Sequence, residues 1–106
     1  MKKRTHEHPG TIRMVDLSRG TTRDKPIDEV PEEQRFVYLK DGAATQDPNE
    51  ATEVVPVVLV EMMAVDKSGK LVPPEKANKI FIREFGPDRR PLRSTTMVPE
   101  RPQAPG

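Results

Sequence analysis

The residues that could do chemistry in this chain are few and widely spaced. Two histidines flank a glutamate near the amino end, in His6-Glu7-His8. Imidazole and carboxylate groups bind metals, but a built metal site uses three or four ligands. The sequence has no further histidine and no cysteine. It therefore predicts neither a metal site nor a bound cofactor.

Catalytic groups are equally sparse, and the sequence predicts that the protein is not an enzyme. Without cysteine there is no thiol nucleophile and no disulfide. Glu61 stands inside an apolar run, where burial can raise a carboxyl pKa and prepare an acid or base. We expect it instead to pair with a cation on a neighbouring strand, such as Arg83, or to face solvent. Gly69-Lys70 lacks the remaining residues of a phosphate-binding loop, so residues 66–70 are predicted to form a hairpin tip.

Basic residues gather near both ends of the chain, with a third cluster in residues 19–23. Such side chains can neutralise phosphates, pair with acidic protein surfaces or stay solvated. We take the basic and apolar side chains of the two ends as candidate partner-binding residues: Lys2, Lys3, Arg4, Arg89, Arg90, Leu92, Arg93, Met97 and Val98.

The composition limits the size of the core. The chain has 106 residues, of which 33% are hydrophobic and 33% charged, and its twelve prolines are about twice the usual share. It lies between a small globular domain and a disordered segment. The net charge of +1 gives no overall attraction to nucleic acid or membranes. No apolar segment follows the first basic residues, and no run could span a bilayer, so we expect cytoplasmic synthesis and no membrane partner.

The longest apolar run, TEVVPVVLVEMMAV at residues 52–65, decides the fold class. Its valines favour a strand over a helix at residues 57–65, because β-branched side chains lose rotamer freedom in helices. The strand would be apolar on both faces, and Pro56 would mark its start, an edge or a bulge. Further elements are expected as follows: strands at residues 11–17, 35–40 and 79–85, loops at 18–26 and 41–51, and helical turns at 27–34 and 74–78.

These strands predict a mainly β fold, as a small antiparallel sheet, an open barrel or a sandwich. The β-rich domain would cover residues 11–85, with an amino-terminal arm at residues 1–10. Residues 86–106 are rich in proline and arginine and poor in apolar side chains, so a carboxy-terminal extended arm is expected there. The four aromatic side chains of the chain are expected in the core, with a base-stacking platform as the alternative: Phe36, Tyr38, Phe81 and Phe85.

No motif identifies a family, so the functional hypotheses follow from architecture. The sequence favours a structural or interaction protein whose sheet and arms contact the subunits of a larger assembly, including copies of itself. By analogy with small, β-rich, armed proteins, we expect a virion component, such as a bacteriophage head decoration (cement) protein or tail accessory protein, located in the virion after assembly. The alternatives are a small nucleic-acid-binding module with an OB-like barrel and basic tails, and an inhibitor or regulator of a partner protein.

Overall fold

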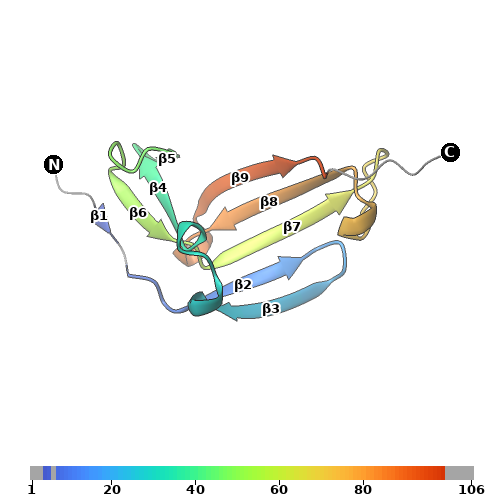
Figure 1. The fold of residues 1–106 in the computed structure, drawn as a ribbon, viewed down its shortest axis with the longest axis horizontal. Helices are drawn as coiled ribbons and strands as arrows, with labels where there is room; N and C mark the ends of the chain where they lie inside the picture. Colours follow the sequence, from blue (N-terminus) through green and yellow to red (C-terminus); the bar gives the residue numbers. More distant parts are fainter. Residues whose placement is uncertain (1–3, 6, 100–106) are drawn as a thin grey trace.

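Two β-sheets make up the computed structural model, which describes residues 4–5 and 7–99 (Figure 1). The large sheet has the strand order β3-β2-β7-β8-β9, and the small sheet has the order β1-β6-β4-β5. The large sheet consists of β2 (Thr11–Asp16), β3 (Thr21–Pro26), β7 (Leu59–Val65), β8 (Lys79–Phe85) and β9 (Pro91–Met97). The small sheet consists of β1 (Arg4–Thr5), β4 (Phe36–Lys40), β5 (Ala43–Ala44) and β6 (Glu53–Pro56).

The prediction of a mainly β fold is confirmed, but neither sheet closes into a barrel and the pairing is not uniformly antiparallel. β7 pairs with β2 in parallel, and β1 pairs with β6 in parallel, while the other ladders are antiparallel. The chain leaves the β2–β3 hairpin, builds β4, β5 and β6, and then returns to the large sheet beside β2. The chain re-enters the large sheet at the end where β2 begins, so β7 and β2 run in the same direction.

The apolar run that predicted one long strand is divided between the two sheets. Pro56 is the last residue of β6, and β7 begins at Leu59. Between them, the Val57 amide donates a hydrogen bond to the Arg35 carbonyl, and the Val58 amide donates one to the Phe85 carbonyl, both at 2.9 Å. Arg35 directly precedes β4 of the small sheet, whereas Phe85 is the last residue of β8 in the large sheet. The run is β-structured, as expected, but it crosses from one sheet to the other.

The core lies where the two sheets meet. Val57 is fully buried there, and Gly86 lies so close to Val55 and Leu92 that an added Cβ would be 2.8 Å from Val55 Cγ1. The buried apolar side chains of this junction come from both sheets, from the segment between β3 and β4 and from the link between β6 and β7: Ile12, Val30, Val37, Leu39, Val55, Val57 and Leu92.

Two segments differ from their predictions because their ladders use polar residues. Residues 18–26 were expected to be a loop, but Thr21–Pro26 forms β3, a polar edge strand paired along its whole length with β2. Residues 86–106 were expected to be an arm, but Pro91–Met97 forms β9 on the outer side of β8, and Leu92 is buried. At the other end of the chain, part of the expected arm forms β1 beside β6.

The remaining connections agree with their predictions in outline. The 41–51 segment is a loop apart from the two residues of β5. Asp66 opens a turn in which Gly69 has a φ of 86°, although β8 starts only after a further connection. The helical turns are 3₁₀ turns at η1 (Ile27–Glu29), η2 (Glu32–Gln34) and η3 (Pro74–Lys76), and a fourth, η4 (Pro87–Arg89), precedes β9. Within the described residues, no helix has the length and apolar character that crossing a membrane requires.

Candidate protein-binding surface

One face of the large sheet presents apolar side chains that the core does not use. The register pairs Leu59 with Phe85 and Met63 with Phe81 across β7 and β8, and paired residues point to the same side of a sheet. All four are only half-buried, and none belongs to the core cluster. We call this side the open face and define it by Val15, Leu59, Glu61, Met63, Phe81, Arg83 and Phe85.

An ion pair crosses the middle of the open face. Arg83 donates a hydrogen bond from Nη2 to Glu61 Oε1 at 3.0 Å, across the β7–β8 ladder. The same guanidinium lies 5.9 Å from the centre of the Phe85 ring, which is within the range of a cation–π contact. The predicted pairing of Glu61 with Arg83 is confirmed, so this carboxylate is held by a cation rather than left as an isolated acid.

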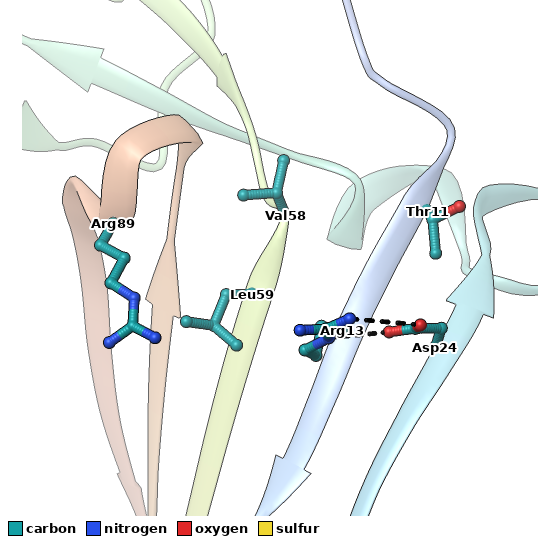
Figure 2. Close-up of a pocket in the computed structure, with 6 residues that line it drawn as sticks. All are labelled: Thr11, Arg13, Asp24, Val58, Leu59 and Arg89. Atoms are coloured by element: carbon teal, nitrogen blue, oxygen red, sulfur yellow. Dashed lines mark hydrogen bonds and ion pairs between the residues drawn. The ribbon is translucent and has the colours of Figure 1, made fainter.

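A hollow of about 450 Å³ lies at the Leu59 end of the open face (Figure 2). Leu59 is placed between two arginines, with Arg13 on one side and Arg89 on the other. Arg13 is bound to Asp24 on β3, with Nε 3.0 Å from Oδ1. This hydrogen bond raises the pKa of Arg13 and lowers the pKa of Asp24, so the charge of Arg13 is already compensated.

Arg89 differs from Arg13 because no ion pair or hydrogen bond holds its side chain within the described part of the chain. It lies in a turn where Asp88 and Arg89 both have left-handed backbone angles, with φ of 60° and 57°. Non-glycine residues in this region cost roughly 1–2 kcal/mol each. Strained backbone of this kind is often found at functional sites, and here it holds a free cation at the edge of an apolar surface.

A second hollow of about 470 Å³ lies at the other end of β7 and β8, beside Met63 and Phe81. Lys79 lines it, and its ammonium group has no hydrogen bond or ion pair to any described residue. Asp66 also lines it, but its carboxylate accepts a hydrogen bond from the Ser68 hydroxyl at 2.6 Å, and this bond lowers the pKa of Asp66. The open face is thus an apolar strip with an uncompensated cation near each end.

The structure does not bring the predicted partner-binding residues to one site. Arg89 lines the first hollow, whereas Arg90 binds both carboxylate oxygens of Glu53 and Arg93 binds both of Glu84. Leu92 is buried in the core and cannot contact a partner. The other candidates are placed as follows: Met97 and Val98 are exposed at the end of β9, Arg4 is in β1, and Lys2 and Lys3 lie outside the described residues.

The half-buried apolar residues of the open face were not identified as a site from the sequence. Phe81 and Phe85 were expected in the core, and Leu59 and Met63 were seen only as part of a strand with two apolar faces. That doubly apolar pattern was the available signal, because a chain this small can cover only one face from within.

His8 has a structural role instead of the metal-binding role considered for His6-Glu7-His8. Its Nε2 atom is 2.8 Å from the Val57 carbonyl oxygen, and its Nδ1 atom accepts a hydrogen bond from the Gly10 amide. The ring also packs edge-on against Phe36, with 5.6 Å between ring centres. These contacts assign the proton to Nε2. His6 lies outside the described residues, among which no three histidine, aspartate or glutamate side chains cluster as metal ligands would.

In comparisons with known proteins, no family model, no curated protein and no solved structure matches the chain.

Proposed function

We propose that the protein is a structural or interaction protein that binds other protein subunits through its open face. The observation that carries the proposal is the half-buried strip of Leu59, Met63, Phe81 and Phe85, which no core residue covers. Contiguous apolar patches on a folded protein are typical of interaction sites. Binding a partner there would remove these side chains from water.

The charges of the open face indicate what kind of partner fits. Arg89 and Lys79 are uncompensated and lie near opposite ends of the strip, while the cations between them are paired. A partner with an apolar surface and carboxylates at matching positions would complement both features. Such complementarity contributes to specificity and association rate more than to affinity.

The nucleic-acid alternative has less support. Phe81 and Phe85 lie on the large sheet, whereas Phe36 and Tyr38 lie on the small sheet. The four rings therefore do not form one stacking platform of the kind that single-stranded nucleic acids use.

The more specific hypothesis of a virion component, such as a bacteriophage head or tail accessory protein, stays a prediction. It shares its chemistry with the hypothesis of an inhibitor or regulator, since both require binding to a protein surface. The identity of the partner distinguishes them: a subunit of a particle supports a structural role, and an enzyme whose activity falls on binding supports regulation.

The proposal is tested by affinity purification of the tagged protein from its native cells, followed by mass spectrometry. We compare the natural chain with Met63→Lys, which places a charge in the apolar strip, and with Thr21→Lys as a control on the exposed edge strand β3. A direct partner should be lost with Met63→Lys and retained with Thr21→Lys, with all three proteins melting as folded domains. Equal recovery of every partner by Met63→Lys would contradict the proposal.

With a purified partner, Arg89→Glu isolates the electrostatic part of the interaction. Reversing one charge opposite a carboxylate should raise the Kd by about tenfold, which corresponds to about 1.4 kcal/mol, mainly through slower association at low salt. The measurement is surface plasmon resonance at two salt concentrations. An unchanged Kd would mean that the partner does not contact this end of the open face.

A further inference from the structure

The outer edge of β9 is a second surface that the fold leaves unpaired. β9 is the last strand in the order of the large sheet, and among the described residues its one ladder partner is β8. A strand in this position has backbone N–H and C=O groups that point away from the sheet. The side chains of residues 94–97 are all exposed, and Met97 is 48% exposed.

The two edges of the large sheet differ in how they are protected. β3, at the opposite edge, carries Arg23, Asp24, Lys25 and Pro26, and charged side chains and proline are the usual means of preventing edge-to-edge pairing. β9 carries no charge and no proline between Ser94 and Val98. Of these two edges, β9 is therefore the one that another strand can extend.

We infer that β9 pairs in antiparallel fashion with β9 of a second copy, around a two-fold axis at Thr95. This register places Thr95 opposite its own counterpart, Ser94 opposite Thr96, and Arg93 opposite Met97. Hydroxyl pairs of this kind are favourable cross-strand neighbours, and no two charges of the same sign face each other. The edge is therefore complementary to itself, as a two-fold interface requires.

The flanking residues restrict where the axis of this ladder can lie. Centring the axis on Arg93 would place two guanidinium groups opposite each other, which is unfavourable. Pro91 and Pro99 flank the segment and have no amide proton to donate. β4 and β5 contact β9, and Leu92 is held in the core, so we place the intermolecular ladder at residues 93–97.

This inference does not depend on the proposed function, because it uses the edge of the sheet and not its open face. Met63→Lys should leave the self-association unchanged if the edge forms the dimer. Loss of partner binding and loss of the dimer are therefore separate outcomes.

The test is sedimentation equilibrium of the full chain, which has a mass of 12.0 kDa as a monomer. The natural protein should dimerise, whereas Thr95→Lys alone and Thr95→Glu alone should stay monomeric, because each places like charges opposite each other. An equal mixture of the two variants should recover the dimer, because the opposed charges are then of opposite sign. Thr21→Lys, on the protected edge, should dimerise like the natural chain, and thermal melting checks that each variant is folded.

Hydrogen exchange gives a second readout that needs no substitution. Raising the protein concentration should slow exchange at alternate amides of residues 93–97, since those amides face the second copy. A monomer at every concentration, a dimer that survives in both single variants, or a dimer whose β9 amides exchange as fast as in the monomer would each overturn the inference.

Discussion

Glu84 is the buried charged side chain of the described chain, with 8% of its surface exposed. Arg93, its cross-strand neighbour on β9, donates hydrogen bonds to both carboxylate oxygens at 2.7 and 2.9 Å. These bonds raise the pKa of Arg93. Arg93 was predicted to bind a partner, but in the structure it pairs with the Glu84 carboxylate of the same sheet.

Replacing Arg93 should consequently affect folding. Arg93→Met leaves the Glu84 carboxylate without a partner, and an unsatisfied buried group costs about 1–3 kcal/mol. The double variant Glu84→Leu with Arg93→Met removes both polar groups and should recover most of that loss. Urea unfolding of the two variants and the natural chain measures the difference. A double variant that is less stable than Arg93→Met would show that the pair stabilises the sheet in its own right.

Individual ion pairs were only partly predictable from the sequence. Glu61 lies inside an apolar strand and was therefore expected to have a cationic partner. Arg83 was named as an example, and it is the partner in the structure. Arg89 and Arg90 are adjacent in sequence, yet Arg90 binds Glu53, whereas the side chain of Arg89 has no such partner among the described residues. The different directions of these two side chains follow from the left-handed backbone of Asp88 and Arg89. The residue types in this turn do not predict that backbone conformation.

The turn that follows β7 is held by a carboxylate. Asp66 accepts hydrogen bonds from the Ser68 hydroxyl, the Ser68 amide and the Lys70 amide, and the first of these has the largest effect in lowering its pKa. These bonds organise the first part of the connection from β7 to β8.

The lowered pKa makes the contribution of this turn depend on pH. A carboxyl group whose pKa is lower in the folded state than in the unfolded state stabilises the fold above its unfolded pKa, about 3.9 for aspartate. This stabilisation is lost as the pH falls through the folded pKa. Asp66→Ala should therefore melt below the natural chain at pH 7, and the gap should narrow below about pH 4. Melting curves from neutral to strongly acidic pH measure it, and a gap that stays constant would contradict the assignment.

Strand prediction succeeded where side chains are buried and failed where backbone pairing dominates. β7 and β8 are rich in apolar residues and were expected. β3 and the outer part of β9 are polar, and they were predicted to be a loop and an arm. Backbone ladders to β2 and β8 hold these two strands in place, and little of their side-chain surface is buried. Composition alone does not report an edge strand of this kind.

At the scale of the molecule, the junction of the two sheets depends on a glycine. Gly86 has a φ of −89°, so its backbone suits any residue, and its role is steric. An added Cβ would lie 2.8 Å from Val55 Cγ1 on the small sheet and 3.3 Å from Leu92 Cδ1 on the large sheet.

Gly86→Ala should therefore destabilise the protein by about 1–3 kcal/mol through overpacking. If the clash is with Val55, the substitution Val55→Ala should cost less in a chain that already carries Gly86→Ala than in the natural chain. Equilibrium unfolding of the natural chain, the two single variants and the double variant gives this coupling directly. Additive effects would show that the two sheets are not in contact through Gly86.

The fold class was predictable, but the division into two sheets was not. The run at residues 52–65 is long enough for a single strand, and its valines correctly favoured a strand over a helix. The change of sheet at Val57 and Val58 depends on carbonyl partners at Arg35 and Phe85, which are distant in the sequence. Periodicity within the run does not contain that information.

The two interaction surfaces would act together if both proposals hold. An antiparallel ladder between two copies of β9 places the open faces of both copies on the same side of the joined sheet. Two partners, or two repeats of one partner, would then bind side by side, and the second contact would benefit from a raised effective concentration. β3, with its charges and proline, would form both outer edges and stop further growth.

The parallel ladder between β2 and β7 also has a consequence for how the chain reaches its native state. The β2–β3, β7–β8 and β8–β9 pairs join neighbouring segments and close comparatively short loops. The β2–β7 pair must close a loop that contains most of the small sheet, and the entropy lost in closing a loop grows with its length. Folding slows as contacts become less local. The hairpins can therefore form early, and the large sheet becomes continuous only when β7 reaches β2.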